Sequence, residues 1–332
     1  MKYFQKSDDK IICLLCPRKC NLSNEQTGFC KAVTNSNNTL QFKGYGYSSG
    51  FAIDPIEKKP LYHFYPGSQV LSFGTFGCNM GCVFCQNHNI SKHSFDINRA
   101  VKANPEQIVQ TALAYNCKSI AFTYNEPVVF LDYAIETAKL AKYNNIKTVA
   151  VTSGYMLLEP AKEFYSYIDA VNIDLKAFSN SFYKKYCWAD INYVLDIIKY
   201  VVTETNCILE LTTLLIDGEN NNYKELNQEF EWIINNLGSD TPVHLSAFHP
   251  DYKFLNKQQT TEKMIIDARN IAKESGLKFV YGGNVRNNEI SVTACPNCGF
   301  KLIERDGYNI KNTGLNIDKC INCGQKIYGK FN

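Results

Sequence analysis

Eleven of the fourteen cysteines in this 332-residue sequence fall into three groups with short spacing. In a reducing cytoplasm, clustered thiols more often bind metal or do chemistry than form disulfides. Two groups hold four cysteines and could each close a tetrahedral metal site, whereas a group of three leaves one coordination position open for chemistry. The groups are Cys13, Cys16, Cys20 and Cys30; Cys78, Cys82 and Cys85; and Cys295, Cys298, Cys320 and Cys323.

The two outer groups each have two interpretations. The last group forms CPNCG and CINCG pairs, a spacing typical of the two knuckles of a zinc ribbon. An auxiliary iron–sulfur cluster is the alternative. For the first group, in CLLCPRKC, we prefer a structural zinc site, and an auxiliary cluster stays open because thiolates suit both metals.

Short β-rich segments alternate with helical patterns from residue 69 onward, which predicts a parallel sheet with helical crossovers. No GxGxxG motif follows the first strand, which argues against a dinucleotide-binding fold. The expected strands are 69–76, 119–124, 147–152, 170–175, 207–216, 242–248 and 278–283. The expected helices are 105–116, 128–145, 158–167, 190–203, 222–237 and 260–275.

Polar residues gather at the predicted carboxyl ends of these strands, where ligands bind in such folds. The cysteine trio follows the first strand. Asp174 and Lys176 are two apart on one strand, so their side chains share a face. The pattern predicts a site for a polar, zwitterionic ligand beside an iron–sulfur cluster. Its further members are Asn125 and Glu126 after the second strand, Thr152 and Ser153 after the third, and His249 after the sixth.

Three regions are expected: a four-cysteine metal-binding region at 1–68, an α/β core at 69–293 and a zinc-ribbon-like module at 294–332. The net charge of +3 indicates neither a nucleic-acid-binding nor an anionic-membrane-binding protein. No apolar stretch is long enough for a transmembrane helix or a signal peptide, so we expect a cytoplasmic protein. Lys58 and Lys59, in a proline-bounded segment, are expected in a solvated loop.

Cys78-x3-Cys82-x2-Cys85, with Phe84 before the last cysteine, resembles the radical S-adenosylmethionine (SAM) motif. Further segments resemble one branch of that superfamily, the AmmeMemoRadiSam-system radical SAM enzymes, which are relatives of the pyruvate formate-lyase activating enzymes. These segments are DPIEKKPLYHFYPG, FTYNEP, VTSGY, NIDLK and SAFHPDYK. The resemblance implies a partial (β/α)6 barrel in which three thiolates hold a 4Fe–4S cluster and SAM chelates the fourth iron. Reductive cleavage of SAM then gives a 5′-deoxyadenosyl radical that abstracts hydrogen from a substrate.

The resemblance also implies roles for the strand-end residues, and Phe84 is grouped with the cofactor-binding set. Residues 124–127 take the place of a GGEP segment that receives the methionine amino group, although Tyr124 and Asn125 replace the two glycines. Asp174 and Lys176 match a DLK segment near SAM and substrate, and His249 matches a histidine near the ribose. Thr152 and Ser153 stand where relatives carry an Asp-Thr pair.

The leftover cysteines are Cys117, Cys187 and Cys207. Cys117 and Cys207 are interpreted as core residues near strand starts. Cys187 is interpreted as a packed residue, with a catalytic role in relaying the radical as the alternative.

Three functions compete. The first is a radical SAM enzyme that acts on a small organic substrate, with an electron donor such as flavodoxin or ferredoxin and with partner proteins of its system. The second is an activase that places a glycyl radical on a protein. The third is a non-catalytic zinc-ribbon interaction protein, against which the intact cysteine trio argues.

Overall fold

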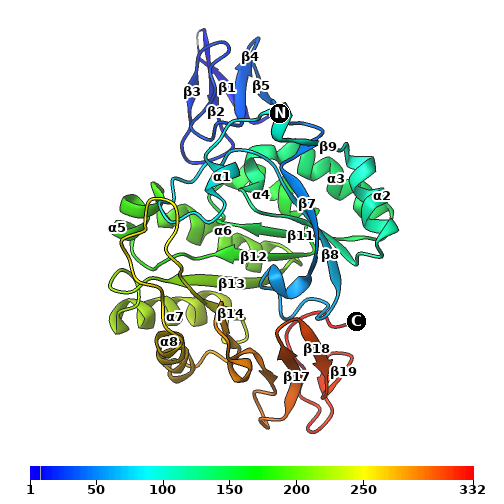
Figure 1. The fold of residues 1–332 in the computed structure, drawn as a ribbon, viewed down its shortest axis with the longest axis vertical. Coiled ribbons are helices and arrows are strands. Elements are labelled where there is room, and N and C mark those ends of the chain that lie inside the picture. Colours follow the sequence, from blue (N-terminus) through cyan, green and yellow to red (C-terminus); the bar gives the residue numbers. More distant parts are fainter. Residues whose placement is uncertain (8) are drawn as a thin grey trace. The chain divides into compact units, whose positions relative to one another are not determined.

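The computed structural model describes residues 1–7 and 9–332, and these form two compact units. Figure 1 follows the chain from the blue N-terminal strands to the red C-terminal ones. Unit 1 comprises Met1–Asp54, Gln69–Val171 and Tyr186–Cys207, and unit 2 comprises Pro55–Ser68, Asn172–Lys185 and Ile208–Asn332.

Unit 1 begins with two small antiparallel sheets that carry the first cysteine group. The first sheet contains β1 (Phe4–Ser7), β2 (Lys10–Cys13) and β3 (Asn21–Leu22), and the second pairs β4 (Val33–Ser36) with β5 (Thr39–Phe42). Cys13 ends β2 and Cys20 directly precedes β3, so these short strands fix the positions of two of the four cysteines. A further short pair joins β6 (Tyr47–Ser48) to β9 (Val101–Lys102).

The α/β part of unit 1 has strands in the order β11-β10-β8-β7, and β8, β10 and β11 run parallel. Strand β10 is buried along its whole length, as expected for a parallel strand covered on both faces. Helix α2 starts at Pro105 behind a capping box between Asn104 and Gln107. The strands are β7 (Gly50–Pro55), β8 (Gln69–Gly74), β10 (Ser119–Phe122) and β11 (Lys147–Thr152). The helices are α1 (His88–Ser91), α2 (Pro105–Ala114), α3 (Leu131–Tyr143), α4 (Leu158–Tyr165) and α6 (Ile191–Glu204).

Unit 2 repeats the same strand–helix alternation. Strands β13 (Ile208–Leu215), β14 (Val243–Ala247) and β15 (Val280–Gly283) run parallel in the order β15-β14-β13. Strand β12 (Ala170–Asp174) has its first two residues in unit 1 and the rest in unit 2. The helices are α5 (Asn180–Phe182), α7 (Tyr223–Leu237) and α8 (Glu262–Glu274), and Asn222 and Thr261 cap the last two.

All seven predicted strands and six predicted helices are confirmed, with shifts of a few residues at their ends. The expected helix 128–145 begins as a 3-10 turn at Pro127–Phe130 before α3. The α/β class with a parallel sheet is therefore confirmed. Among the residues that the structure describes, no helix is both long and apolar enough to cross a membrane.

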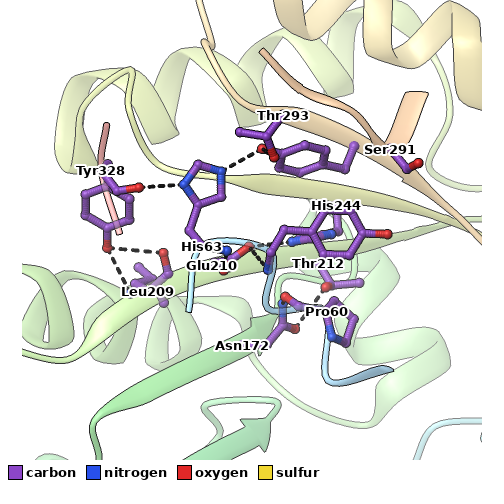
Figure 2. A network of polar contacts seen from close by, with 12 residues as sticks. Pro60, His63, Asn172, Leu209, Glu210, Thr212, His244, Ser291, Thr293 and Tyr328 are labelled. Carbon is purple, nitrogen blue, oxygen red and sulfur yellow. Dashed lines mark hydrogen bonds and ion pairs between the residues drawn. The ribbon is translucent and has the colours of Figure 1, made fainter. Parts of the chain in front are cut away.

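Residues 55–68, here called the strap, are joined to β13 of unit 2 by a buried polar network (Figure 2). The carboxylate of Glu210 on β13 accepts hydrogen bonds from the backbone N–H groups of Tyr62 and His63, at 3.0 and 2.7 Å, and pairs with His244 Nε2 at 2.7 Å. His63 also contacts Tyr281 Oη and the backbone oxygen of Tyr328. The expectation of a solvated loop is wrong for Lys59, which is buried, and right for Lys58, which is exposed.

The C-terminal part of unit 2 consists of short antiparallel strands whose apolar side chains share one core with the α/β part of that unit. Phe279 and Tyr281 of the α/β part pack in one cluster with Leu302, Ile303 and other ribbon side chains. The strands are β16 (Thr293–Ala294), β17 (Lys301–Asp306), β18 (Asn309–Asn312), β19 (Leu315–Asn316) and β20 (Lys319–Cys320).

Candidate functional site

The cysteine trio lies on the loop that follows β8 in unit 1. Cys82 and Phe84 are buried, whereas Cys78 and Cys85 are partly exposed. The backbone N–H of Met80 donates to Cys78 Sγ at 3.4 Å, and Cys85 Sγ lies 3.1 Å from Ser91 Oγ at the end of α1. Three thiols on one loop, with hydrogen-bond donors to sulfur, are a donor set that fits an iron–sulfur cluster.

Asn125 joins the start of this loop to the end of β10. Its Oδ1 accepts from the backbone N–H of Thr75 at 2.8 Å, and its Nδ2 donates to Thr75 Oγ1 at 3.1 Å and to the Gly77 carbonyl at 2.7 Å. The preceding Tyr124 has a φ of 70°, a region that favours glycine. The tyrosine thus keeps a left-handed backbone at a position where the similar family carries glycine.

Glu126 connects the ends of β10 and β11. It is buried, and its carboxylate accepts from the hydroxyl of Thr152 and from both the backbone N–H and the hydroxyl of Ser153, the last two at 2.8 and 2.5 Å. The structure therefore brings Glu126, Thr152 and Ser153 together as one hydrogen-bonded group.

Burial raises the pKa of the Cys78 thiol to about 12, and the positive charge of Lys92 acts in the opposite direction. Lys92 Nζ donates to the Met80 carbonyl at 2.7 Å, so the ammonium is fixed beside the loop. Because metals bind the thiolate, loading of this site must release protons.

The last cysteine group has the dimensions of a zinc site. Its four sulfur atoms all lie within 4.8 Å of one another, with Sγ–Sγ distances of 3.6 Å for Cys295–Cys323 and 3.7 Å for Cys298–Cys320. Zinc–sulfur bonds of about 2.3 Å in a tetrahedron require sulfur–sulfur edges of about 4 Å. Two equivalent turns hold the ligands, since Gly299 N–H donates to the Cys295 carbonyl and Gly324 N–H to the Cys320 carbonyl.

The first cysteine group lines one cavity in unit 1. Cys13 and Cys16 are buried, and Cys20 and Cys30 are partly exposed. Apolar side chains of Leu15, Leu22, Val33, Val128 and Val129 complete most of the wall, together with Arg18 and Asn79. The structure therefore gathers these four predicted ligands around a common space.

The remaining predicted site residues belong to unit 2. Lys176 Nζ donates to Asp174 Oδ2 at 2.8 Å, so the two side chains meet, although β12 ends at Asp174 and Lys176 lies beyond the strand. His249 lines a cavity of about 1040 Å³ at the carboxyl ends of β14 and β15. The other lining side chains are mainly polar and include Gln259, Thr260, Asn284, Arg286 and Asn287.

Several residues beside the cysteine loop escaped the sequence analysis. Arg18 donates to the backbone carbonyls of Asn79 and Trp188, both at 2.5 Å. Asn79 donates to the Tyr155 carbonyl at 2.5 Å. A signal for Arg18 was present, since it stands inside the first cysteine group.

Cys187 is fully buried, and its carbonyl accepts from Gly81 N–H at 2.8 Å, so it lies against the loop.

The sequence of this chain is similar to one protein family and to two proteins of known sequence. The model of the Radical SAM superfamily matches residues 73–230. An uncharacterized protein of Methanocaldococcus jannaschii is 42% identical over 305 residues, which is 92% of this chain and 90% of that protein. A second protein of the same organism, named as a candidate glycyl-radical enzyme activating enzyme, is 26% identical over 62% of this chain and 77% of its own length.

A solved structure gives the same result for the fold. The crystal structure of a radical SAM methyltransferase from Sphaerobacter thermophilus superposes with a TM-score of 0.53 at 16% identity, covering 72% of this chain and 71% of that one. At this identity the likeness concerns the fold alone.

Proposed function

Since the chain belongs to the radical SAM superfamily, an enzyme superfamily that uses a 4Fe–4S cluster and SAM, we propose that it abstracts hydrogen from a small organic substrate. The observation that carries the proposal is the Cys78–Cys82–Cys85 loop after β8, which Asn125 holds at Gly77, together with the neighbouring hydrogen-bonded group of Glu126, Thr152 and Ser153. The cluster and SAM supply the carbon radical, and the protein positions and shields it.

The residues of unit 1 hold the loop in place. Cys78, Cys82 and Cys85 bind three irons, and Phe84, which is buried on the same loop, belongs to the cofactor-binding set. Asn125 fixes the start of the loop through Thr75 and Gly77. Glu126 fixes Thr152 and Ser153, so these three act as one group that lines the SAM position.

The polar residues of unit 2 offer groups that suit a polar, zwitterionic ligand. The Asp174–Lys176 pair offers an anion and a cation to a zwitterionic ligand. His249 and the polar wall of the large cavity offer hydrogen bonds to a polar molecule, and Arg286 offers a positive charge. Cys187 is a buried packing residue in this proposal, with no role in the radical chemistry.

Radical SAM enzymes need a one-electron donor, and we propose flavodoxin or ferredoxin for this chain. The C-terminal group of Cys295, Cys298, Cys320 and Cys323 binds structural zinc in the proposal, supported by its sulfur spacing.

The test is formation of 5′-deoxyadenosine from SAM by anaerobically reconstituted, reduced protein. The Cys82→Ala variant should form none, whereas Cys117→Ala, which removes a buried cysteine outside the three groups, should retain activity. A fully loaded wild-type protein that never cleaves SAM, with or without candidate substrates, would contradict the proposal.

The activase hypothesis has one observation in its favour, the 26% identity to a protein named for that activity. It predicts that SAM cleavage accelerates only when a glycyl-radical protein is added, and that a glycyl radical then appears in the electron paramagnetic resonance (EPR) spectrum of that protein. Cleavage stimulated by small molecules alone would favour the first proposal.

A further inference from the structure

The three cysteine groups differ in the separation of their sulfur atoms. Within residues 1–7 and 9–332, the C-terminal four are the only set of three or more metal-ligating side chains whose ligand atoms all lie within 4.8 Å of one another. Among the described residues, neither Cys13, Cys16, Cys20 and Cys30 nor the trio of the Cys78 loop forms such a compact set. The first group therefore lacks the compact spacing of the zinc-like set, as the trio of the Cys78 loop also does.

This difference bears on the metal. A single zinc ion holds four sulfurs about 4 Å apart. A 4Fe–4S cluster places an iron under each thiolate, so it spreads its ligands farther than one ion can. The four cysteines also surround a shared cavity whose wall is mostly aliphatic, and an apolar wall of this kind shields a cluster from water.

Direct contacts join the first group to the Cys78 loop within unit 1. The backbone N–H of Cys78 donates to the Cys30 carbonyl at 3.0 Å. Arg18, between Cys16 and Cys20, donates to the Asn79 carbonyl at 2.5 Å, and its guanidinium lies 3.4 Å from the Phe29 ring centroid. Asn79 belongs to the loop and also lines the cavity of the first group. A single backbone hydrogen bond thus joins Cys30 of the first group to Cys78 of the loop.

We propose that Cys13, Cys16, Cys20 and Cys30 bind a second 4Fe–4S cluster, which passes single electrons to the cluster of the Cys78 loop. The electron-transfer part rests on the proposed radical function, whereas the metal assignment does not. A low-potential one-electron donor of the flavodoxin or ferredoxin class loses one electron and the N-terminal cluster gains it. That cluster is reoxidised as the Cys78-loop cluster is reduced, so one electron leaves the donor for each one delivered.

The first experiment measures iron, sulfide and zinc in anaerobically reconstituted full-length protein. Cys20→Ser should lose half of the iron and sulfide, with the zinc unchanged. The remaining cluster should still change its EPR spectrum when SAM is added, because it is the one with the open iron. Cys82→Ala should also lose half of the iron but leave a cluster that is insensitive to SAM. Cys298→Ser is the matched control and should lose zinc without losing iron.

A measurement on the unmodified protein guards against a misfolded variant. Mössbauer spectra of the wild type should contain two 4Fe–4S clusters, of which SAM perturbs one. Zinc in place of iron at the first group, seen as a second zinc equivalent and a single cluster, would overturn the metal assignment.

The electron-transfer part has its own readout. Reduced flavodoxin should no longer reduce the SAM-sensitive cluster of Cys20→Ser, whereas dithionite, a small reductant, should reduce it as in the wild type. Unchanged reduction by flavodoxin would overturn the electron-transfer role and leave the metal assignment standing. Two clusters without any SAM cleavage would contradict the proposed function instead, so the failures are distinguishable.

Discussion

The Glu126 carboxylate accepts two hydrogen bonds from Ser153, one from its backbone N–H and one from its hydroxyl, and Glu126 is only 4% exposed. A side chain at the end of one strand therefore fixes the backbone at the end of the next. The residue for which we propose a role beside the cofactor therefore also builds the framework of the site.

Glu126→Gln should destabilise unit 1, because an amide NH2 group would face donors that now meet a carboxylate oxygen. An unsatisfied buried donor costs about 1–3 kcal/mol. Urea unfolding of the two proteins measures the difference. Glu159→Gln, which removes an exposed partner of Lys162, is the control and should unfold as the wild type does. Equal stability of Glu126→Gln and wild type would show that the group is not structural.

Gly77→Ala should disturb both sulfur sites of unit 1 together. Gly77 has a φ of 83°, and a Cβ atom there would lie 2.2 Å from the Cys30 carbonyl oxygen, so the backbone would have to move. Gly218 has a similar φ of 71°, and a Cβ atom there would have no other atom within 4 Å, which makes Gly218→Ala a matched control. The control should lose only the roughly 1–2 kcal/mol of left-handed strain. Thermal unfolding and iron content measure both effects.

Lys92→Gln should slow iron uptake at the Cys78 loop. The Lys92 charge opposes the burial that raises the pKa of Cys78 to about 12, so its removal raises that pKa further and leaves less thiolate. Because the thiolate fraction grows with pH below the pKa, uptake should accelerate as pH rises in both proteins. The initial rate of cluster absorbance during anaerobic reconstitution is the readout. Lys31→Gln, on an exposed neighbour that donates to the Lys92 carbonyl, should be close to wild type.

The strap of unit 2 should make stability depend on pH through His63. Burial lowers the pKa of His63 from about 6.5 to about 4, despite the opposing charge of Glu210. Arg305 and His244 also face it and lower the pKa further. Because the histidine pKa is lower in the folded than in the unfolded protein, the neutral side chain contributes to the free energy of unfolding above about pH 6.5. This contribution, on the order of 3 kcal/mol, is lost as the pH falls toward 4.

His63→Phe should flatten that dependence, whatever its effect on stability at neutral pH. Urea unfolding between these two pH values gives the slope for each protein. If the free energy of unfolding changed equally with pH in both proteins, protonation of His63 would not be the cause of the pH dependence.

Removal of the zinc that we propose for the C-terminal group should destabilise the ribbon at 294–332. Structural zinc contributes about 10–16 kcal/mol of apparent binding free energy in small domains. Limited proteolysis after treatment with a chelator should cut within 294–332. Retained protease resistance in metal-free protein would contradict a structural role.

Local spacing was enough to predict most of this molecule. The Cys78 motif, the strand periods and the Asp174–Lys176 pair each depend on residues close together in the chain, so the sequence displays them. The tethers of the site depend on residues far apart, such as Asn125 with Gly77, and no spacing rule marks them. The burial of Lys59 was missed for the same reason, because the strands beneath the strap come from distant sequence.

The hydrogen bond between Cys78 N–H and the Cys30 carbonyl uses only main-chain atoms. Replacement of exposed side chains at residues 21–29 leaves such a bond intact, whereas insertion or deletion of one residue shifts the carbonyl that faces the loop. The segment that leads to Cys30 is therefore constrained in length more strictly than in composition. Engineered changes to this region, such as a shortened turn or a fused tag within it, must preserve the residue count even where they change every exposed side chain.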